Sequence, residues 1–427
     1  MTTNADGPIA TAQDPAPPRT APPASAGFIT AFVAAVLGVA VATLAPLSVT
    51  LALRIQQLDP ENAPASLSLV LGVAAVVALL SGPFFGQLSD RTTSRWGMRR
   101  PWLLGGLLVG LIGLVILSMS ASIPMMLLGW CITQLGFSAL NAALAALLID
   151  HVPELQRGKV SGLVGMCQAV GVVTGVFLVQ LVGTSVALMF LVPGALAAAT
   201  VIALSLVLRD RRLDPADRSR YDFRAFARSF WVNPLRHRAF GWAWLGRFLM
   251  MTGFAILQTY QVYYLSDQLG FDAAAIPGLV LQSTLVLTAA VVVSSVGCGW
   301  LSDRLRRRKI FVLGSAALYG VAMIVVATAQ TWETFLVGIV IGGLALGTYL
   351  AVDLALVAQV LPNGGATAAK DLGVFNIANA VPQMVAPAIA PLFLAIGSGG
   401  NYTALFIGAA AFSLLGALAI QPIRGVR

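Results

Sequence analysis

Long apolar stretches alternate with short polar segments along almost the whole chain. An α-helix needs about 20 apolar residues to cross the roughly 30 Å hydrocarbon core of a bilayer, and each of these stretches is about that long. The pattern therefore predicts an all-α integral membrane protein. Twelve transmembrane helices are expected, at residues 28–53, 66–86, 101–121, 124–149, 160–182, 186–208, 239–265, 274–301, 310–329, 333–360, 372–396 and 402–422.

The composition agrees with this pattern and excludes several classes of function. Hydrophobic residues make up 58% of the chain and charged residues 10%, against roughly 25% charged in soluble domains. The spans use nearly the whole length, which leaves no room for a soluble catalytic domain. The two histidines, His151 and His237, lie in polar gaps apart from any carboxylate cluster, and the chain has no G-x-x-x-x-G-K loop for nucleotides. We expect no enzymatic activity, no metal and no cofactor.

The basic residues are distributed on one side only. Of the 26 Lys and Arg, all except Arg54 and Arg247 lie in the two tails or in every second gap between spans. Short loops rich in Lys and Arg stay in the cytoplasm. The distribution predicts a multi-pass protein of the inner or plasma membrane with both termini cytoplasmic. Because topology explains the net charge of +9, that charge does not indicate binding to nucleic acid.

The chain divides into four regions. Residues 1–27 are rich in Pro and Ala and are expected to be a disordered cytoplasmic tail. The longest basic gap, 209–238, is expected to be a cytoplasmic linker. It separates an N-terminal half of six helices, 28–208, from a C-terminal half of six helices, 239–427.

The two halves repeat a motif. G-Q-L-S-D-R begins at Gly86 after the second span, and G-W-L-S-D-R begins at Gly299 after the eighth span, which is the second of its half. Internal repeats of this kind are typical of secondary transporters, in which the substrate binds between the repeats near the middle of the membrane.

G-x-L-x-D-R at these two positions of a twelve-helix chain resembles the signature of the major facilitator superfamily. D-R-T-T-S-R-W-G-M-R-R-P-W from Asp90 and A-L-L-I-D at the end of the fourth span are similar to the glycoside–cation and sucrose–proton symporter branch. That branch usually has an Arg in the fourth span, where this chain has Ala145. The resemblance implies two pseudo-symmetric halves, alternating access and proton-coupled uptake, by a monomer, of a sugar or similar small polar solute.

A drug or metabolite–proton antiporter is the alternative. That class usually has G-P in a glycine-rich fifth helix and an Arg in the fourth helix. This chain has neither, which weighs against efflux and leaves the alternative open.

The duplicated motif suggests a cytoplasmic gate. Asp90 can accept hydrogen bonds from Arg91 or a later arginine of the loop, and it can face the positive end of the helix 11 dipole. Asp303 would do the same against helix 5, and the two motif glycines would let neighbouring helices approach closely. The gate residues expected are Gly86, Asp90, Arg91, Arg99, Gly299, Asp303 and Arg304.

Two charged residues lie well inside spans, at similar depth. Asp353 is in the tenth span, 333–360, and Arg247 is in the seventh, 239–265; below, a helix number such as helix 7 gives the position of the span in this order. A charged group inside the membrane costs a few kcal/mol unless it is paired, hydrated or neutralised. Asp353 is therefore a candidate proton carrier with Arg247 as its partner. A static structural ion pair is the alternative.

Amides and aromatic rings suit the hydroxyls and flat faces of sugars. Asn376, Asn379 and Gln383 share one face of helix 11, beside Pro382 and Pro387, which are expected to interrupt the backbone. Such amides also serve as links between helices. The substrate-contacting residues expected are Asn376, Asn379, Gln383, Gln258, Gln261, Asn141 and Tyr263.

Arg54 and Asp267 occupy corresponding places near the outer ends of helices 1 and 7. They could form an outer gate pair. The alternative is that Arg54 simply lies at the membrane interface without a partner.

Overall fold

The computed structural model describes residues 24–183, 185–210, 237–305, 307–359, 368–397 and 400–423. Within these ranges the regular secondary structure is helical, and twelve helical stretches are long and apolar enough to cross a membrane. The predicted fold class and number of spans are confirmed. Most of the expected tail (1–27) and of the expected linker (209–238) lies outside the described residues.

The first six spans are formed by α1 to α7, and their bounds follow. The helices are α1 (Ala26–Ala45), η1 (Pro46–Thr50), α2 (Leu51–Leu58), α3 (Ala63–Ser89), α4 (Arg100–Ser118), α5 (Ile123–His151), α6 (Glu154–Leu181) and α7 (Val186–Val207). Span 1 consists of α1, the π-helical turn η1 and α2 in sequence.

The last six spans are formed by α9 to α14. The helices are α9 (Arg238–Tyr263), η3 (Tyr264–Gln268), α10 (Ile276–Leu305), α11 (Arg308–Thr328), α12 (Trp332–Gln359), α13 (Ala368–Leu394) and α14 (Tyr402–Ile420). Span 7 ends in a π-helical turn, as span 1 contains one.

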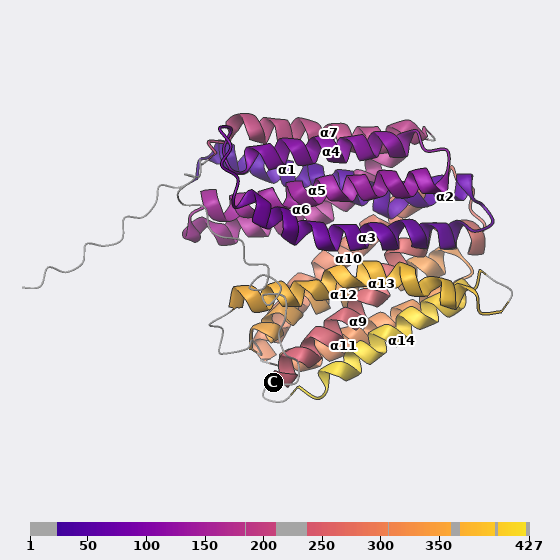
Figure 1. Ribbon diagram of the computed structural model, residues 1–427. Coiled ribbons are helices and arrows are strands. Elements are labelled where there is room, and N and C mark those ends of the chain that lie inside the picture. Colours follow the sequence, from indigo (N-terminus) through magenta and orange to yellow (C-terminus); the bar gives the residue numbers. More distant parts are fainter. Residues whose placement is uncertain are drawn as a thin grey trace, which may run out of the picture.

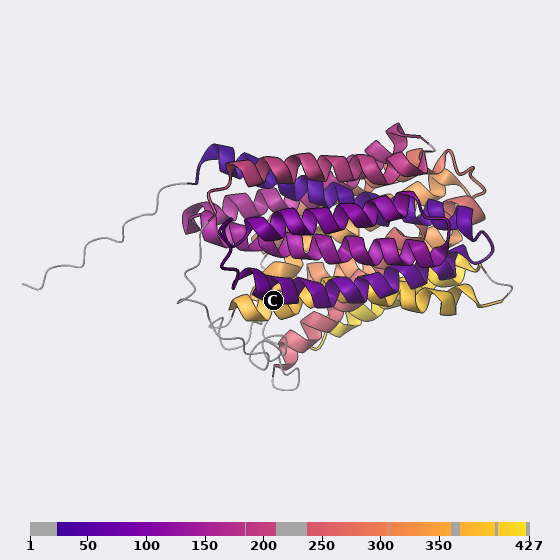
Figure 2. The ribbon, with the colours of Figure 1, turned by 45° about the horizontal axis from the view of Figure 1, so that its top comes forward.

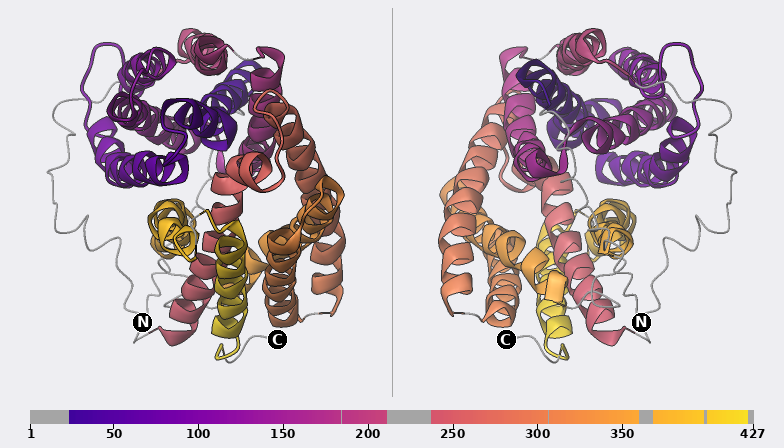
Figure 3. Two further views of the ribbon diagram at one scale, coloured as in Figure 1. Left: turned by 90° about the vertical axis from the view of Figure 1, so that its right-hand side faces the viewer. Right: turned by 90° about the vertical axis from the view of Figure 1, so that its left-hand side faces the viewer.

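The helices form two groups, α1 to α7 and α9 to α14. In Figure 1 the first group, indigo to magenta, lies above the second, orange to yellow. Figure 2 shows the long axes running in broadly the same direction, and Figure 3 shows the two groups side by side when viewed from either end. Between the groups, α3 packs against α13 and α6 against α10. We call these groups the first and second half below.

Consecutive spans run in opposite directions, so the loops gather at two ends. We call the end where α3 and α5 finish and where α4 and α6 begin the basic end, because Arg91, Arg99 and Arg157 lie there. The far end is the opposite one, where α2 finishes at Leu58 and η3 at Gln268.

Several helices extend beyond the apolar stretches that predicted them. α3 continues to Ser89 and α10 to Leu305, so the repeated motif is largely helical rather than opening a loop. α6 already begins at Glu154, before the expected residue 160. The reason is that polar residues can continue a helix past the hydrocarbon core, where hydropathy alone no longer indicates it.

Candidate functional site

A buried ion pair lies within the second half. Arg247 on α9 donates a hydrogen bond to the carboxylate of Asp353 on α12. The side chains of Arg247 and Asp353 are 11% and 2% exposed. A charge at this depth is tolerated only with a partner. The pair therefore joins two helices of the second half through opposite charges.

Two residues of α13 complete the surroundings of Arg247. Its Nε donates to Oδ1 of Asn379 at 2.7 Å. The guanidinium carbon lies 4.8 Å from the centre of the Phe375 ring, a cation–π contact. Tyr349, one turn before Asp353 on α12, is fully buried beside the pair. We call Arg247, Asp353, Asn379, Phe375 and Tyr349 the charge cluster.

The sequence singled out the charges and Asn379 but missed the aromatic members. Phe375 and Tyr349 each lie four residues from a cluster member on the same helix, at positions 375 and 379 of α13 and 349 and 353 of α12. This spacing puts them on one helix face, a signal that was available in the sequence.

Helix α13 runs unbroken through Pro382, Pro387 and Pro391. The expected interruption at Pro382 and Pro387 is wrong. Proline has no N–H, so the carbonyls of Ala378 and Gln383 nevertheless lose their helical donors. Gln383 is half-buried, and the side chain of Asn376 lies outside the described residues.

The other amides expected to contact substrate lie elsewhere. Gln258 and Gln261 line a small cavity between the halves, together with Ser48 of η1 and Thr284 of α10. Its volume is about 30 Å³, enough for a water molecule or two but not for a sugar. Gln258 is roughly 16 Å from Arg247 along α9, at 1.5 Å per residue. The structure thus separates this cavity from the charge cluster. Asn141 is exposed on α5 and belongs to neither.

The halves are joined by hydrogen bonds at the far end. The hydroxyls of Ser68 and Tyr260 lie 2.5 Å apart. Tyr263 donates to the carbonyls of Ala52 at 3.1 Å and Ala63 at 3.3 Å. Tyr263, expected to contact substrate, is fully buried and closes the far end in this conformation.

Asp267 also takes part in this closure, without Arg54. Asp267 accepts from Tyr402 at 2.5 Å and from Gln56 of the other half at 3.3 Å. Arg54 donates to the carbonyl of Ser120 and to Gln57 instead. The expected Arg54–Asp267 gate pair is wrong, because Arg54 finds acceptors within its own half.

The basic end carries an ion-pair network within the first half. Arg99, only 4% exposed, lies 2.6 Å from Asp90 and 2.9 Å from Asp150, and it also donates to Ser89. Burial acts to lower the pKa of Arg99, but hydrogen bonds with Asp90 and Asp150 outweigh it and raise that pKa above its usual value. Asp90 is thus paired with Arg99. We call these residues the Arg99 network.

Asp150 and Asp210 were not among the residues predicted for the gate, although they contact Arg99. Asp210, just past α7, accepts from the backbone N–H groups of Arg99 and Arg100 at 2.7 Å each. It therefore caps the start of α4, where a carboxylate is favourable. Asp150 is the last residue of the A-L-L-I-D segment, which resembles the symporter branch. That resemblance was the sign in the sequence that Asp150 has a role.

The corresponding motif in the second half looks different. The guanidinium of Arg304 lies 5.3 Å from the Trp300 ring, and the side chain of Asp303 lies outside the described residues. A Cβ on Gly86 would meet open space, and one on Gly299 would be 3.5 Å from Ala351, an ordinary contact. The expected close helix approach at these glycines is wrong for this conformation.

The fold and the buried charges define a multi-pass helical membrane protein built as two six-helix groups. The family model of the Major Facilitator Superfamily matches residues 24–297 and 277–425. The chain belongs to this superfamily and is a transporter. Its family and fold are those of proteins that bind small-molecule substrates rather than of enzymes.

Solved structures share the fold at low identity. A bacterial homologue of the human lysosomal transporter Spinster, inward-facing and unoccupied, has a TM-score of 0.69 and 15% identity, covering 93% of this chain and 98% of that one. The nucleoside transporter NupG has a TM-score of 0.71 and 13% identity, covering 94% and 100%. The human organic anion transporter MFSD10 has a TM-score of 0.62 and 16% identity, covering 92% and 99%.

Curated relatives match over short segments. An uncharacterized symporter of Synechocystis sp. is 45% identical over 51 residues, which is 12% of this chain and 9% of the relative. The MFS-type efflux transporter pyiT of Pyricularia grisea is 34% identical over 97 residues, which is 22% of this chain and 15% of the relative. The matches span only a small part of these relatives' length.

Proposed function

We propose that the chain is a proton-coupled importer of a sugar or similar small polar solute, related to the glycoside–cation symporter branch. The observation that carries this proposal is the buried Arg247–Asp353 pair with Asn379. A carboxylate in the membrane can carry a proton because its neutral form needs no counter-charge there. The short match to a symporter is in line with this direction of transport.

Coupling follows from the shared partner. If Asp353 takes up a proton, Arg247 is left buried without its counter-ion, which is strongly unfavourable. A solute oxygen can then replace the carboxylate as acceptor for Arg247, while Asn379 holds the guanidinium in place. Solute and proton would thereby bind together, which is the requirement for symport.

Alternating access would use the two ends in turn. The far end is closed here by Ser68, Tyr260, Tyr263 and Gln56, in hydrogen bonds between the halves. We assign residues 28–208 and 239–427 as the moving halves and 209–238 as their linker. The Arg99 network lies within the first half and would hold Asp90 in position to face the start of span 11 in the opposite state, in which the basic end is closed.

We place the basic end in the cytoplasm, so that both termini face it, and assign the chain to the cell membrane as a monomer. The basic loops support this orientation. A single cysteine at Ser219, in the linker, should react with a membrane-impermeant reagent only from the inside. Labelling from outside would overturn the orientation.

The direct test is uptake by purified protein in sealed vesicles. With an inward-directed proton gradient, a labelled sugar should accumulate above its external concentration, and an uncoupler should abolish the accumulation. Solute-driven alkalinisation of the outside medium should accompany it. Outward movement of a dye or metabolite driven by inward proton flow would instead support the antiporter alternative, which the short match to an efflux transporter favours.

A further inference from the structure

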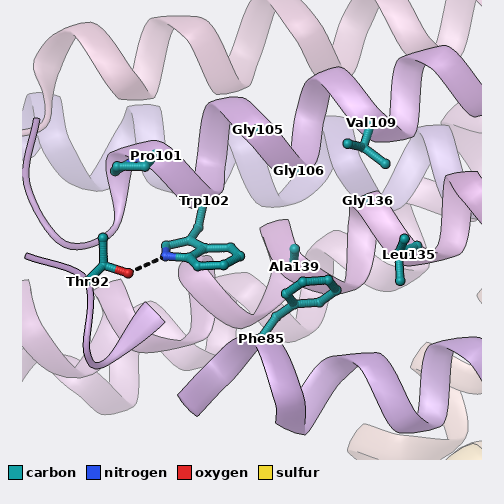
Figure 4. Close-up of a pocket in the computed structure, with 10 residues that line it drawn as sticks. All are labelled: Phe85, Thr92, Pro101, Trp102, Gly105, Gly106, Val109, Leu135, Gly136 and Ala139. Carbon is teal, nitrogen blue, oxygen red and sulfur yellow. Dashed lines mark hydrogen bonds between the residues drawn. The ribbon is translucent and has the colours of Figure 1, made fainter. Parts of the chain in front are cut away.

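A groove lined by α3, α4 and α5 lies in the first half, near the basic end and away from the charge cluster. Its volume is about 350 Å³, within the roughly 300–1,000 Å³ of small-molecule sites. Figure 4 shows Trp102 of α4 and Phe85 of α3 next to each other, with ring centres 5.6 Å apart, and Gly136 and Ala139 of α5 near them along the lining. The lining is almost entirely apolar.

The groove exists because α3 and α4 pack against α5 rather than against each other. On α4, Gly106 touches α5 so closely that a Cβ there would lie 2.7 Å from the carbonyl oxygen of Gly136. Gly105, its neighbour, faces the other way, and a Cβ there would have no heavy atom within 4 Å. The missing side chain of Gly105 therefore leaves room in the groove.

The groove opens to the surface that faces lipid. Large apolar side chains on the same helices are exposed: Phe84, next to Phe85 on α3, at 50%, and Leu108, one turn after Gly105 on α4, at 61%. In a membrane such side chains contact acyl chains. The open side of the groove is therefore accessible from the bilayer without passage through the protein.

The end of the groove at the basic end is polar and positively charged. The indole N–H of Trp102 donates to the hydroxyl of Thr92 at 2.7 Å, and Thr92 lies in the loop that joins α3 and α4. This loop also presents exposed Arg95 and Trp96, the latter 57% exposed. Arginine and tryptophan are the residues that anchor a protein at the headgroup level.

The charge balance of this loop selects the headgroup. Residues 90–100 hold four arginines and one acid, Asp90. Asp90 and Asp150 pair with Arg99, and Asp210 lies against the backbone of Arg99 and Arg100. Four arginines against three carboxylates leave a net charge of +1, and the side chain of Arg95 is exposed. Basic residues near the surface attract anionic lipids.

We propose that the groove binds one acyl chain of an anionic phospholipid, whose headgroup lies at the loop of residues 91–100. The apolar lining takes the chain, and the positive loop takes the phosphate. This site depends on the placement of the helices in the bilayer and is independent of which solute is transported.

Trp102 reports directly on this site, because bromine atoms on an acyl chain quench nearby indole emission. The full chain is reconstituted in vesicles of phosphatidylcholine with increasing fractions of brominated phosphatidylglycerol or brominated phosphatidylcholine. The Trp102 signal is the emission of wild type minus that of Trp102→Phe. Half-maximal quenching should need about fivefold less brominated phosphatidylglycerol than brominated phosphatidylcholine. One basic residue contributes about 1 kcal/mol to binding of an anionic lipid, which corresponds to that factor.

Two variants and one control separate the groove from the general lipid surface. Gly105→Leu fills the groove and should abolish the preference for the anionic lipid. Gly314→Leu on α11, another exposed helical glycine with no heavy atom within 4 Å of its Cβ, should leave the preference unchanged. Arg95→Gln should reduce the preference while quenching at high brominated fraction persists. Melting curves of each variant confirm folding.

Equal quenching by the two brominated lipids in wild type, or an unchanged preference in Gly105→Leu, would overturn the proposal. Sugar uptake by the same vesicles is measured separately. If the wild-type protein shows the lipid preference but takes up no sugar, the proposed transport function is contradicted and the lipid site is not.

Discussion

The hydroxyl groups of Ser68 and Tyr260 lie 2.5 Å apart and join α3 of the first half to α9 of the second. One turn further along α9, Tyr263 bonds to two backbone carbonyls of the first half. In the described part of the chain, the hydrogen bonds between the halves involve residues 52–68 and 260–267. The described conformation is therefore held closed at its far end by a small set of polar contacts.

Removing one of these contacts should shift the balance toward a far end that is open. Tyr260→Phe deletes a hydrogen bond worth about 1 kcal/mol, so the ratio of open to closed molecules should rise about fivefold. The measurement is the labelling rate, by a membrane-impermeant reagent, of a single cysteine at Ser48, which is buried and lines the cavity between the halves.

Tyr264→Phe is the matched control for this experiment. Its hydroxyl bonds to the carbonyls of Val326 and Ala329, both within the second half. It should leave the labelling rate unchanged. Equal rates for Tyr260→Phe and wild type would show that the Ser68–Tyr260 contact does not hold the far end closed.

The number and type of helices could be predicted because hydropathy over about 20 residues reports directly on membrane insertion. The ends of the helices could not, since α3 and α10 continue through polar residues as far as Ser89 and Leu305. The π-turn at Pro46–Thr50 also left no hydropathy signal.

The site was predictable only where burying a polar group has a large cost. Asp353 and Arg247 stand out in any apolar stretch, so their importance could be inferred from sequence. Uncharged amides cost less to bury, so the sequence does not show which of them share a site. Gln261 lines the small cavity between the halves, whereas Asn379 belongs to the charge cluster. Tyr263 and Arg54 bond to backbone carbonyls, which every residue has, so sequence gives no sign of the partner.

The charge cluster should show strong coupling in stability. Arg247→Gln leaves Asp353 buried without its partner and should lower the free energy of unfolding by about 3–5 kcal/mol. The double variant Arg247→Gln/Asp353→Asn removes both charges and should recover most of that loss. Thermal melting of the purified protein in detergent measures both effects. Additive losses in the double variant would show that the two charges do not interact.

The Arg99 network should control closure of the basic end. Arg99→Gln removes hydrogen bonds to two carboxylates, worth about 1.5–3 kcal/mol each, so transport should slow by at least about tenfold with unchanged solute affinity. The raised pKa of Arg99 keeps its guanidinium charged throughout the neutral range, so the contribution of these ion pairs should be constant between about pH 6 and pH 9.

Arg95→Gln changes the same charge at an exposed position of the same loop and is the control. It should transport near the wild-type rate. An Arg99→Gln protein that is as fast as Arg95→Gln would show that the network fixes the loop without controlling closure.

Asp353→Asn should abolish proton-coupled accumulation, because the amide cannot take up and release a proton within the cycle. Exchange of solute between the two sides of the membrane should survive, since movement of the halves does not itself require the proton step. Asp267→Asn is the comparison: this carboxylate lies at the far end, bonded to Tyr402 and Gln56, and its change should leave coupling intact. Uptake and counterflow in sealed vesicles at pH 6 and pH 8 measure both properties. Accumulation by Asp353→Asn with an unchanged pH profile, together with its loss in Asp267→Asn, would move the coupling site to the far end.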